Sequence, residues 1–191
     1  MSSSRMPRRD VPRAVAFAAL ALGLALGSPS NARAYEDRAS FALELGWGVV
    51  GSSAPLPTHG LVSGIGVGFG LNDTWELRVD AAYAVHPETL HRLRTSVEIL
   101  YLVDVIQVVP FVGLGAGASF SFTTAMPPLP PDGNVAIRPD LEAHIVAGFD
   151  VLLDRDWTIG LVVRPIFQLT SAADDLFYLT VTARAQLLVD L

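Results

Sequence analysis

The 191-residue chain contains no cysteine, and its 13 basic residues are all arginines. The absence of cysteine excludes a disulfide framework, a thiolate metal site and a lipid-modified cysteine. After residue 34 there is no uninterrupted apolar run of about 20 residues, the length that a transmembrane helix needs. If this part of the chain crosses a membrane, it must therefore do so as strands.

The first 34 residues have the pattern of a secretory signal peptide. Four arginines precede a short apolar run at 14–26, and small residues follow at Ala32 and Ala34. We expect cleavage before Tyr35, which divides the chain into a signal at 1–34 and one domain at 35–191. An uncleaved membrane anchor is the alternative, but the apolar run is short for a membrane-spanning helix.

Removal of this signal makes the charge of the remaining chain strongly negative. Five of the 13 arginines and one of the 19 acidic residues lie in it, which leaves eight arginines, 18 acidic residues and a net charge of −10. Nucleic acids and anionic lipid surfaces both require clustered cations. We therefore expect neither a nucleic-acid partner nor a polybasic contact with lipid headgroups.

Apolar and polar residues alternate along eight segments that turn residues separate. In 75–85, for example, Trp75, Leu77 and Val79 alternate with Glu76, Arg78 and Asp80. The full set is 41–50, 61–71, 75–85, 93–103, 111–121, 141–153, 159–169 and 179–191. A period of two is typical of a strand with two different faces. Segments of about 9–13 residues have the length that a tilted strand needs to cross a bilayer.

The connections and the aromatic residues indicate which face meets lipid. Short connections at 72–74, 104–107 and 154–156 alternate with longer ones at 51–60, 86–92, 122–138 and 171–176. Aromatic residues of the apolar face gather near the segment ends, and the glycines gather on the polar face. These three features are typical of a barrel with lipid outside and a polar lumen.

Two sequence runs resemble those of known outer-membrane barrels. Residues 109–117, with the sequence VPFVGLGAG, resemble the Pro-aromatic-x-Gly-x-Gly-x-Gly strand common in them, and residues 70–77 resemble their strand–turn–strand unit. The chain is similar over roughly residues 38–191 to the OmpA/OmpX-type porin-like superfamily of small bacterial outer-membrane β-barrel proteins. It departs from that family in ending on Leu191 instead of an aromatic residue.

The resemblance implies a fold, a location and partners. The fold is all-β, an eight-stranded antiparallel up-and-down transmembrane β-barrel in the cell outer membrane. The implied partners are outer-membrane lipid and the barrel insertion machinery, and the implied state is a monomer. The Pro-rich stretch 126–133, in the longest outer connection, is a candidate contact for a partner at the cell surface.

The polar face carries ten charged or titratable side chains that we expect in the lumen. They are Glu44, Glu76, Arg78, Asp80, Arg94, Glu98, Glu142, His144, Arg164 and Arg184. An eight-stranded barrel is just wide enough to be filled by side chains, so these charges should pair and fill it. The resulting hypothesis is a non-enzymatic barrel, structural or porin-like. A narrow polar path gated by the same pairs is the alternative.

A lipid hydrolase is a minor alternative. Ser119 and Ser121 could supply the nucleophile, His144 the base and Glu142 the orienting carboxylate. No known signature spans these residues, so we expect neither an enzyme nor a cofactor. The histidines lack metal-ligand spacing, and three of them, His59, His86 and His91, are expected at the outer rim without a metal.

Two structural alternatives remain open from the sequence. A soluble periplasmic barrel of the lipocalin type would have the faces reversed, with an apolar ligand inside and Arg78 or Arg184 facing water. Residues 90–103 also fit a helical stripe, which would make them an interfacial helix. The stripe consists of Leu90, Leu93, Val97 and Leu100.

Overall fold

The computed structural model describes residues 37–51, 58–86, 90–103, 107–123, 137–170 and 177–191. They form eight strands: β1 Arg38–Gly51, β2 Thr58–Gly70, β3 Trp75–Val85, β4 Leu90–Leu102, β5 Val108–Thr123, β6 Ile137–Leu152, β7 Trp157–Gln168 and β8 Phe177–Asp190. Each of the eight segments predicted from alternation is a strand. The predicted signal at 1–34 and the Pro-rich stretch 126–133 lie outside the described residues.

The helical alternative for residues 90–103 is wrong. Residues 90–102 form β4, in which residues 91–101 pair with β3 on one side and residues 90–102 with β5 on the other. Strand pairing on both sides satisfies the backbone groups of β4 between its neighbours. Among the described residues, no helix is long and apolar enough to cross a membrane.

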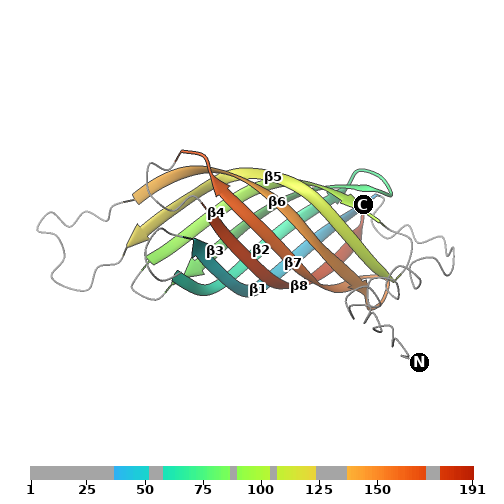
Figure 1. Ribbon diagram of the computed structural model, residues 1–191. Coiled ribbons are helices and arrows are strands. Elements are labelled where there is room, and N and C mark those ends of the chain that lie inside the picture. The colour runs from blue at the N-terminus through green and yellow to red at the C-terminus, as the bar shows by residue number, and fades with distance from the viewer. Residues whose placement is uncertain (1–36, 52–57, 87–89, 104–106, 124–136, 171–176) are drawn as a thin grey trace, which may run out of the picture.

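The strands close into a barrel in which each pairs antiparallel with its neighbours in sequence, and β8 pairs with β1 (Figure 1). Successive partners can be followed once around the barrel: Ser40, Gly68, Arg78, Glu98, Gly115, His144, Ile166, Tyr178 and Val50. The path returns to β1 ten residues beyond its start, which defines the stagger of the barrel. Eight strands with this stagger tilt by about 40° from the barrel axis.

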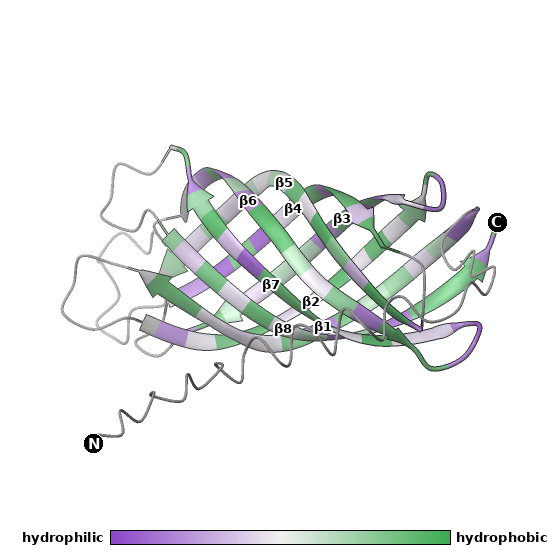
Figure 2. Cartoon of the chain, turned by 45° about the vertical axis from the view of Figure 1, so that its right-hand side comes forward, coloured by the Kyte–Doolittle hydropathy of each residue, from purple (hydrophilic) through white to green (hydrophobic). Residues whose placement is uncertain are grey.

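The two faces of the barrel differ in polarity. Hydrophobic and hydrophilic residues alternate along the strands (Figure 2). Leu43, which points outward, is 66% exposed, whereas the inward Arg78 and Arg184 are 1% and 2% exposed. The lipocalin alternative required these two arginines to face water and is therefore wrong. An apolar exterior around a polar interior is the arrangement of a barrel that sits in lipid.

The two ends of the barrel also differ. At one end lie the tight turns after β2 and β6, where the Asn72 and Asp154 side chains accept hydrogen bonds from backbone N–H groups two and three residues ahead. Arg38 in β1 pairs with Asp190 in β8 at the same end. We call this the short-turn end. The long connections join the strands at the opposite end.

Exposed aromatic residues lie near both ends of the outer face. Near the short-turn end these are Phe41, Phe69, Trp75, Tyr101, Phe149 and Trp157, and near the long-connection end Trp47, Tyr83, Phe120, Phe167 and Phe177. Amphipathic rings prefer the lipid–water boundary, so the two groups mark the two membrane surfaces.

Candidate functional site in the barrel lumen

All ten polar residues singled out in the sequence lie on the inner wall of the barrel. Nine are buried, and Glu44 is nearly so, with a side chain that is 9% exposed. Side chains alternate between the two faces of a strand, and these ten residues all occupy positions of the polar face, which points inward. All ten belong to two connected groups and one separate pair.

Arg164 is the centre of the first group. Its Nη1 and Nη2 donate to the two carboxylate oxygens of Glu44 at 2.7 and 2.9 Å, and its Nε donates to Glu98 Oε1 at 2.7 Å. Such a two-pronged guanidinium–carboxylate contact is among the stronger hydrogen-bonded pairs. Arg164, in β7, thereby connects β1 with β4 across the lumen.

Glu98 extends this group to β3 and β6. His144 Nε2 lies 2.9 Å from Glu98 Oε1, and Arg78 Nη1 lies 4.0 Å from Glu98 Oε2. Arg78 also donates to both oxygens of Glu76, which accepts a further hydrogen bond from Ser40. A continuous chain of alternating charge therefore runs through the middle of the barrel.

The second group lies nearer the long-connection end. Arg94 Nη2 donates to Asp80 at 2.6 Å, and Ser96 Oγ donates to the same carboxylate at 3.0 Å. The Glu142 carboxylate is buried 3.8 Å from Arg94 Nε and accepts no hydrogen bond from the described residues. This leaves Glu142 the most weakly held acid of the ten.

The separate pair joins Arg184 to Asp150, and both side chains are fully buried. Asp150 is absent from the residues proposed from the sequence. It lies on the polar face of its segment together with Glu142 and His144. This position in the alternation could have identified it. Arg184 also lies over the ring of Phe111, with 4.7 Å between its Cζ and the ring centroid.

Glycines make room for these contacts. Gly115 is paired with Glu98 on one side and His144 on the other, and Gly160 lies in the same way between Asp150 and Arg184. A Cβ at Gly115 would lie 2.2 Å from His144 Nε2, and one at Gly160 would lie 2.2 Å from Asp150 Oδ1. The bare backbone lets a side chain reach across one strand to a partner on the next.

Apolar side chains fill the lumen on both sides of the charged middle. Leu100, Leu102, Val109, Phe111, Val146, Val162 and Leu188 form a cluster at the short-turn end, which we call the inner plug. Val50, Val62, Ala84, Ile166 and Tyr178 form a second cluster near the other end. Sequence analysis missed both clusters, because their members interrupt the polar pattern of the inward face.

The side chains of the described lumen are mostly buried. A cavity beside Arg94, Arg164 and Tyr178 has a volume of about 10 Å³, which is room for about one water molecule. Most of the lumen around it is filled by side chains.

The residues of the hydrolase hypothesis are not paired for catalysis. His144 Nε2 is bound to Glu98, and Ser121 Oγ accepts a hydrogen bond from Arg92 at 3.3 Å. Ser119 is opposite Asp140 in the β5–β6 pairing, two residues closer to the long-connection end than Glu142. The Ser119 hydroxyl has no hydrogen-bond partner among the described residues. Within the described part of the chain no cluster of three or more His, Asp or Glu side chains could hold a metal ion.

The long-connection end carries the three histidines that the sequence placed at the outer rim. His59 stacks on Trp47, and His91 stacks on Tyr83, both on the outer side. His86, just beyond the end of β3, is buried in the mouth of the barrel, where its ring meets Tyr178 edge-on. Burial and the nearby Arg92 guanidinium lower the pKa of His86 below its ordinary value.

Comparisons with known proteins give structural matches alone. No protein-family model matches the chain, and no curated protein matches it in sequence. Neisserial surface protein A matches with a TM-score of 0.68 at 11% identity, over 78% of this chain and 96% of that one. OprG from Pseudomonas aeruginosa matches with a TM-score of 0.58 at 10% identity, over 83% of this chain and 99% of that one.

A third match is a single domain of a larger protein. The N-terminal β-barrel domain of Pseudomonas aeruginosa OprF gives a TM-score of 0.55 at 16% identity, over 81% of this chain and 98% of that one. All three have low identity and show the fold. The chain thus has the fold of the small eight-stranded barrels of bacterial outer membranes.

Proposed function

We propose that this protein is a non-enzymatic outer-membrane barrel whose lumen is closed, so that it acts as a structural scaffold at the cell surface and not as an open pore. The observation that carries the proposal is the sequence of layers in the lumen. The charged group around Arg164 fills the middle, and the inner plug that includes Leu100 and Phe111 fills the short-turn end.

Each layer opposes ion passage in its own way. An ion in the middle would have to separate Arg164 from Glu44 and Glu98, leaving buried charges without partners, which is energetically costly. An ion at the inner plug would have to enter an apolar constriction, and such constrictions exclude water. These two barriers act in series along the barrel axis.

The exterior of the barrel supports the location and partners of this proposal. The apolar outer face, the two aromatic groups and the likeness to outer-membrane proteins support insertion in the outer membrane, with the short-turn end in the periplasm. The partners of this proposal are outer-membrane lipid and the barrel insertion machinery, and the protein is a monomer. The predicted signal at 1–34 supports export.

Conductance in planar lipid bilayers tests the closed lumen. The wild-type protein and the Arg184→Ala variant should both give no current steps, because the inner plug remains in each. A variant with Arg164→Ala, Phe111→Gly, Leu188→Gly and Tyr178→Ala removes the centre of the charged group and part of both apolar clusters, and it should conduct. Steady current steps from the wild-type protein, with all preparations shown to be folded by heat-dependent gel mobility, would contradict the proposal.

A further inference from the structure

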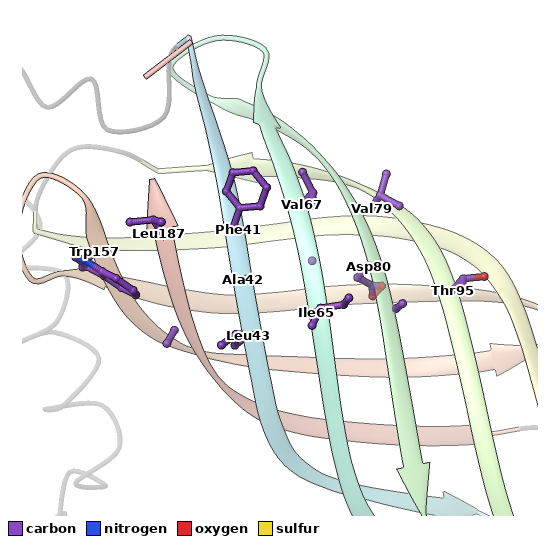
Figure 3. A pocket seen from close by; sticks show the side chains of 13 residues that line it. Phe41, Ala42, Leu43, Ile65, Val67, Val79, Asp80, Thr95, Trp157 and Leu187 are labelled. Carbon is purple, nitrogen blue, oxygen red and sulfur yellow. The ribbon is translucent and has the colours of Figure 1, made fainter. Parts of the chain in front are cut away.

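A shallow apolar groove of about 570 Å³ crosses the outer face of the barrel from β7 to β4 (Figure 3). One edge is a row of large side chains on successive strands: Trp157, Leu187, Phe41, Val67 and Val79. The opposite edge is the next row of strand partners: Ala185, Leu43, Ile65, Ala81 and Thr95. Ala42 and Gly66, which has no side chain, lie between the two rows. The groove lies between these two rows, and the small side chains of Ala185, Ala81 and Thr95 leave room at both of its ends.

The stagger of the barrel gives this groove a slope. Successive partners climb toward the long-connection end on going from β7 through β8 and β1 to β4. Trp157 is the first residue of β7, at the short-turn end, whereas Thr95 lies in the middle of β4. Five inter-strand steps lead from Trp157 to Val97, the β4 partner of Val79 and next but one to Thr95. At about 4.8 Å a step and a tilt of about 40° they rise about 15 Å, half of a hydrocarbon core of about 30 Å.

The groove therefore extends from one membrane surface to about the middle of the bilayer. An acyl chain of a lipid in one leaflet covers the same depth. At the short-turn end that leaflet is the periplasmic one, if the barrel has the orientation proposed above. The lining is almost entirely apolar, as contact with an acyl chain requires.

Charged groups of both signs surround the lower end of the groove. The Arg155 side chain, two residues before Trp157, is 76% exposed, and its Nη2 lies 2.6 Å from Asp190 Oδ2. Asp156 and Asp190 are each 58% exposed and are both paired with Arg38. Together with Asp154, the end of the groove carries three carboxylates and two guanidinium groups.

We propose that the groove is a binding site for a phospholipid with a zwitterionic amine headgroup, of the phosphatidylethanolamine type, in the periplasmic leaflet. One acyl chain lies along the groove against Phe41 and Leu187. The phosphate meets the exposed Arg155 guanidinium, and the ammonium group meets the Asp156 and Asp190 carboxylates. The excess of carboxylates disfavours an anionic headgroup at the same place.

Trp157 provides a reporter inside the site. The chain has three tryptophans, so a Trp47→Phe, Trp75→Phe background leaves Trp157 as the sole one. This protein is refolded into phosphatidylcholine vesicles that contain either phosphatidylethanolamine or phosphatidylglycerol with brominated acyl chains, and bromine quenching of Trp157 is measured. We expect the ethanolamine lipid to associate about fivefold more strongly, which corresponds to about 1 kcal/mol.

Two substitutions separate the groove from general lipid contact. Ala185→Leu fills the groove and should abolish the preference for the ethanolamine lipid. Ala147→Leu adds the same bulk to the outer face of β6, away from the groove, and should leave the preference unchanged. If Ala185→Leu does not fold, as judged by heat-dependent gel mobility, Ala81→Leu replaces it at the same groove.

A third substitution tests the headgroup contacts. Asp156→Asn removes a carboxylate contact to the ammonium group on an exposed turn and should reduce the preference for the ethanolamine lipid without affecting folding. Equal quenching by the two lipids, a preference for phosphatidylglycerol, or a preference that survives both Ala185→Leu and Asp156→Asn would each overturn the proposal. The measurement does not depend on whether the lumen conducts ions.

Discussion

His144 on β6 binds Glu98 on β4 across β5, at the level where β5 has Gly115. β4 and β6 are not neighbours, so the His144 side chain must reach over the backbone of β5. Its Nε2 then lies 2.9 Å from Glu98 Oε1. Asp150 and Arg184 have the same relationship across Gly160. The lumen glycines are therefore part of the charge pairing, and their effect on stability can be tested separately from the charges.

Gly115→Ala should destabilise the barrel, because the new Cβ would lie 2.2 Å from His144 Nε2. We expect a loss of about 1–3 kcal/mol in the free energy of unfolding, the usual cost of overpacking. Gly66→Ala is the matched control, since the nearest atom to its Cβ is 3.6 Å away. Urea unfolding of both variants in lipid vesicles, followed by tryptophan fluorescence, measures the difference, and equal losses would contradict the crossing role of Gly115.

Asp150→Ala should lower the free energy of unfolding more than the replacement of both Asp150 and Arg184 does. Alone it leaves the buried Arg184 charge without its carboxylate, with an expected loss of about 3–5 kcal/mol. The double variant Asp150→Ala, Arg184→Met removes the charge as well and should recover part of that loss. A double-mutant cycle of unfolding free energies measures the coupling, and strictly additive effects would show that the pair does not act as a unit.

Much of the fold could be predicted from the sequence because alternation reports directly on the two faces of a strand. Residues Trp75–Val85 alternate without interruption and form β3 within the same bounds. Parity also placed Arg164 and Glu98 on one inner surface. Alternation alone did not decide whether that surface faces the lumen or the lipid. The lengths of the connections and the positions of the aromatic residues were needed for that decision.

Two features of the lumen could not be predicted in the same way. Alternation assigns a residue to one face of its strand, but not to a level along the barrel axis or to a partner. Asp150 and Arg184 lie on strands that are not adjacent, so their pairing depends on the stagger of the closed barrel. The inner plug was missed for a related reason. Leu100 and Phe111 are isolated apolar residues on otherwise polar faces, and they become a cluster only when the barrel brings their levels together.

Arg38 should stabilise the junction between the first and last strands. Its guanidinium contacts Asp190 at 2.8 Å, Asp156 at 3.0 Å and the Arg155 carbonyl oxygen at 2.6 Å. Because both carboxylates are more than half exposed, water screens these contacts, and Arg38→Ala should lower the free energy of unfolding by about 1 kcal/mol. Arg155→Ala, at the far more exposed arginine of the same cluster, should have a smaller effect, and the loss for Arg38→Ala should shrink in high salt.

Acidification should destabilise the barrel through His86, the buried histidine beyond the end of β3. Its pKa is lowered in the folded protein from the ordinary value of 6.5, because burial and Arg92 disfavour the charged ring. Below pH 6.5 the unfolded chain therefore binds a proton that the folded chain takes up only at lower pH, and the free energy of unfolding falls as the pH drops through this range. His86→Gln cannot take up this proton, so its unfolding free energy should change less than that of the wild-type protein over the same range. Urea titrations of both proteins on the two sides of pH 6.5 make the comparison, and parallel losses in both would show that His86 is not the group responsible.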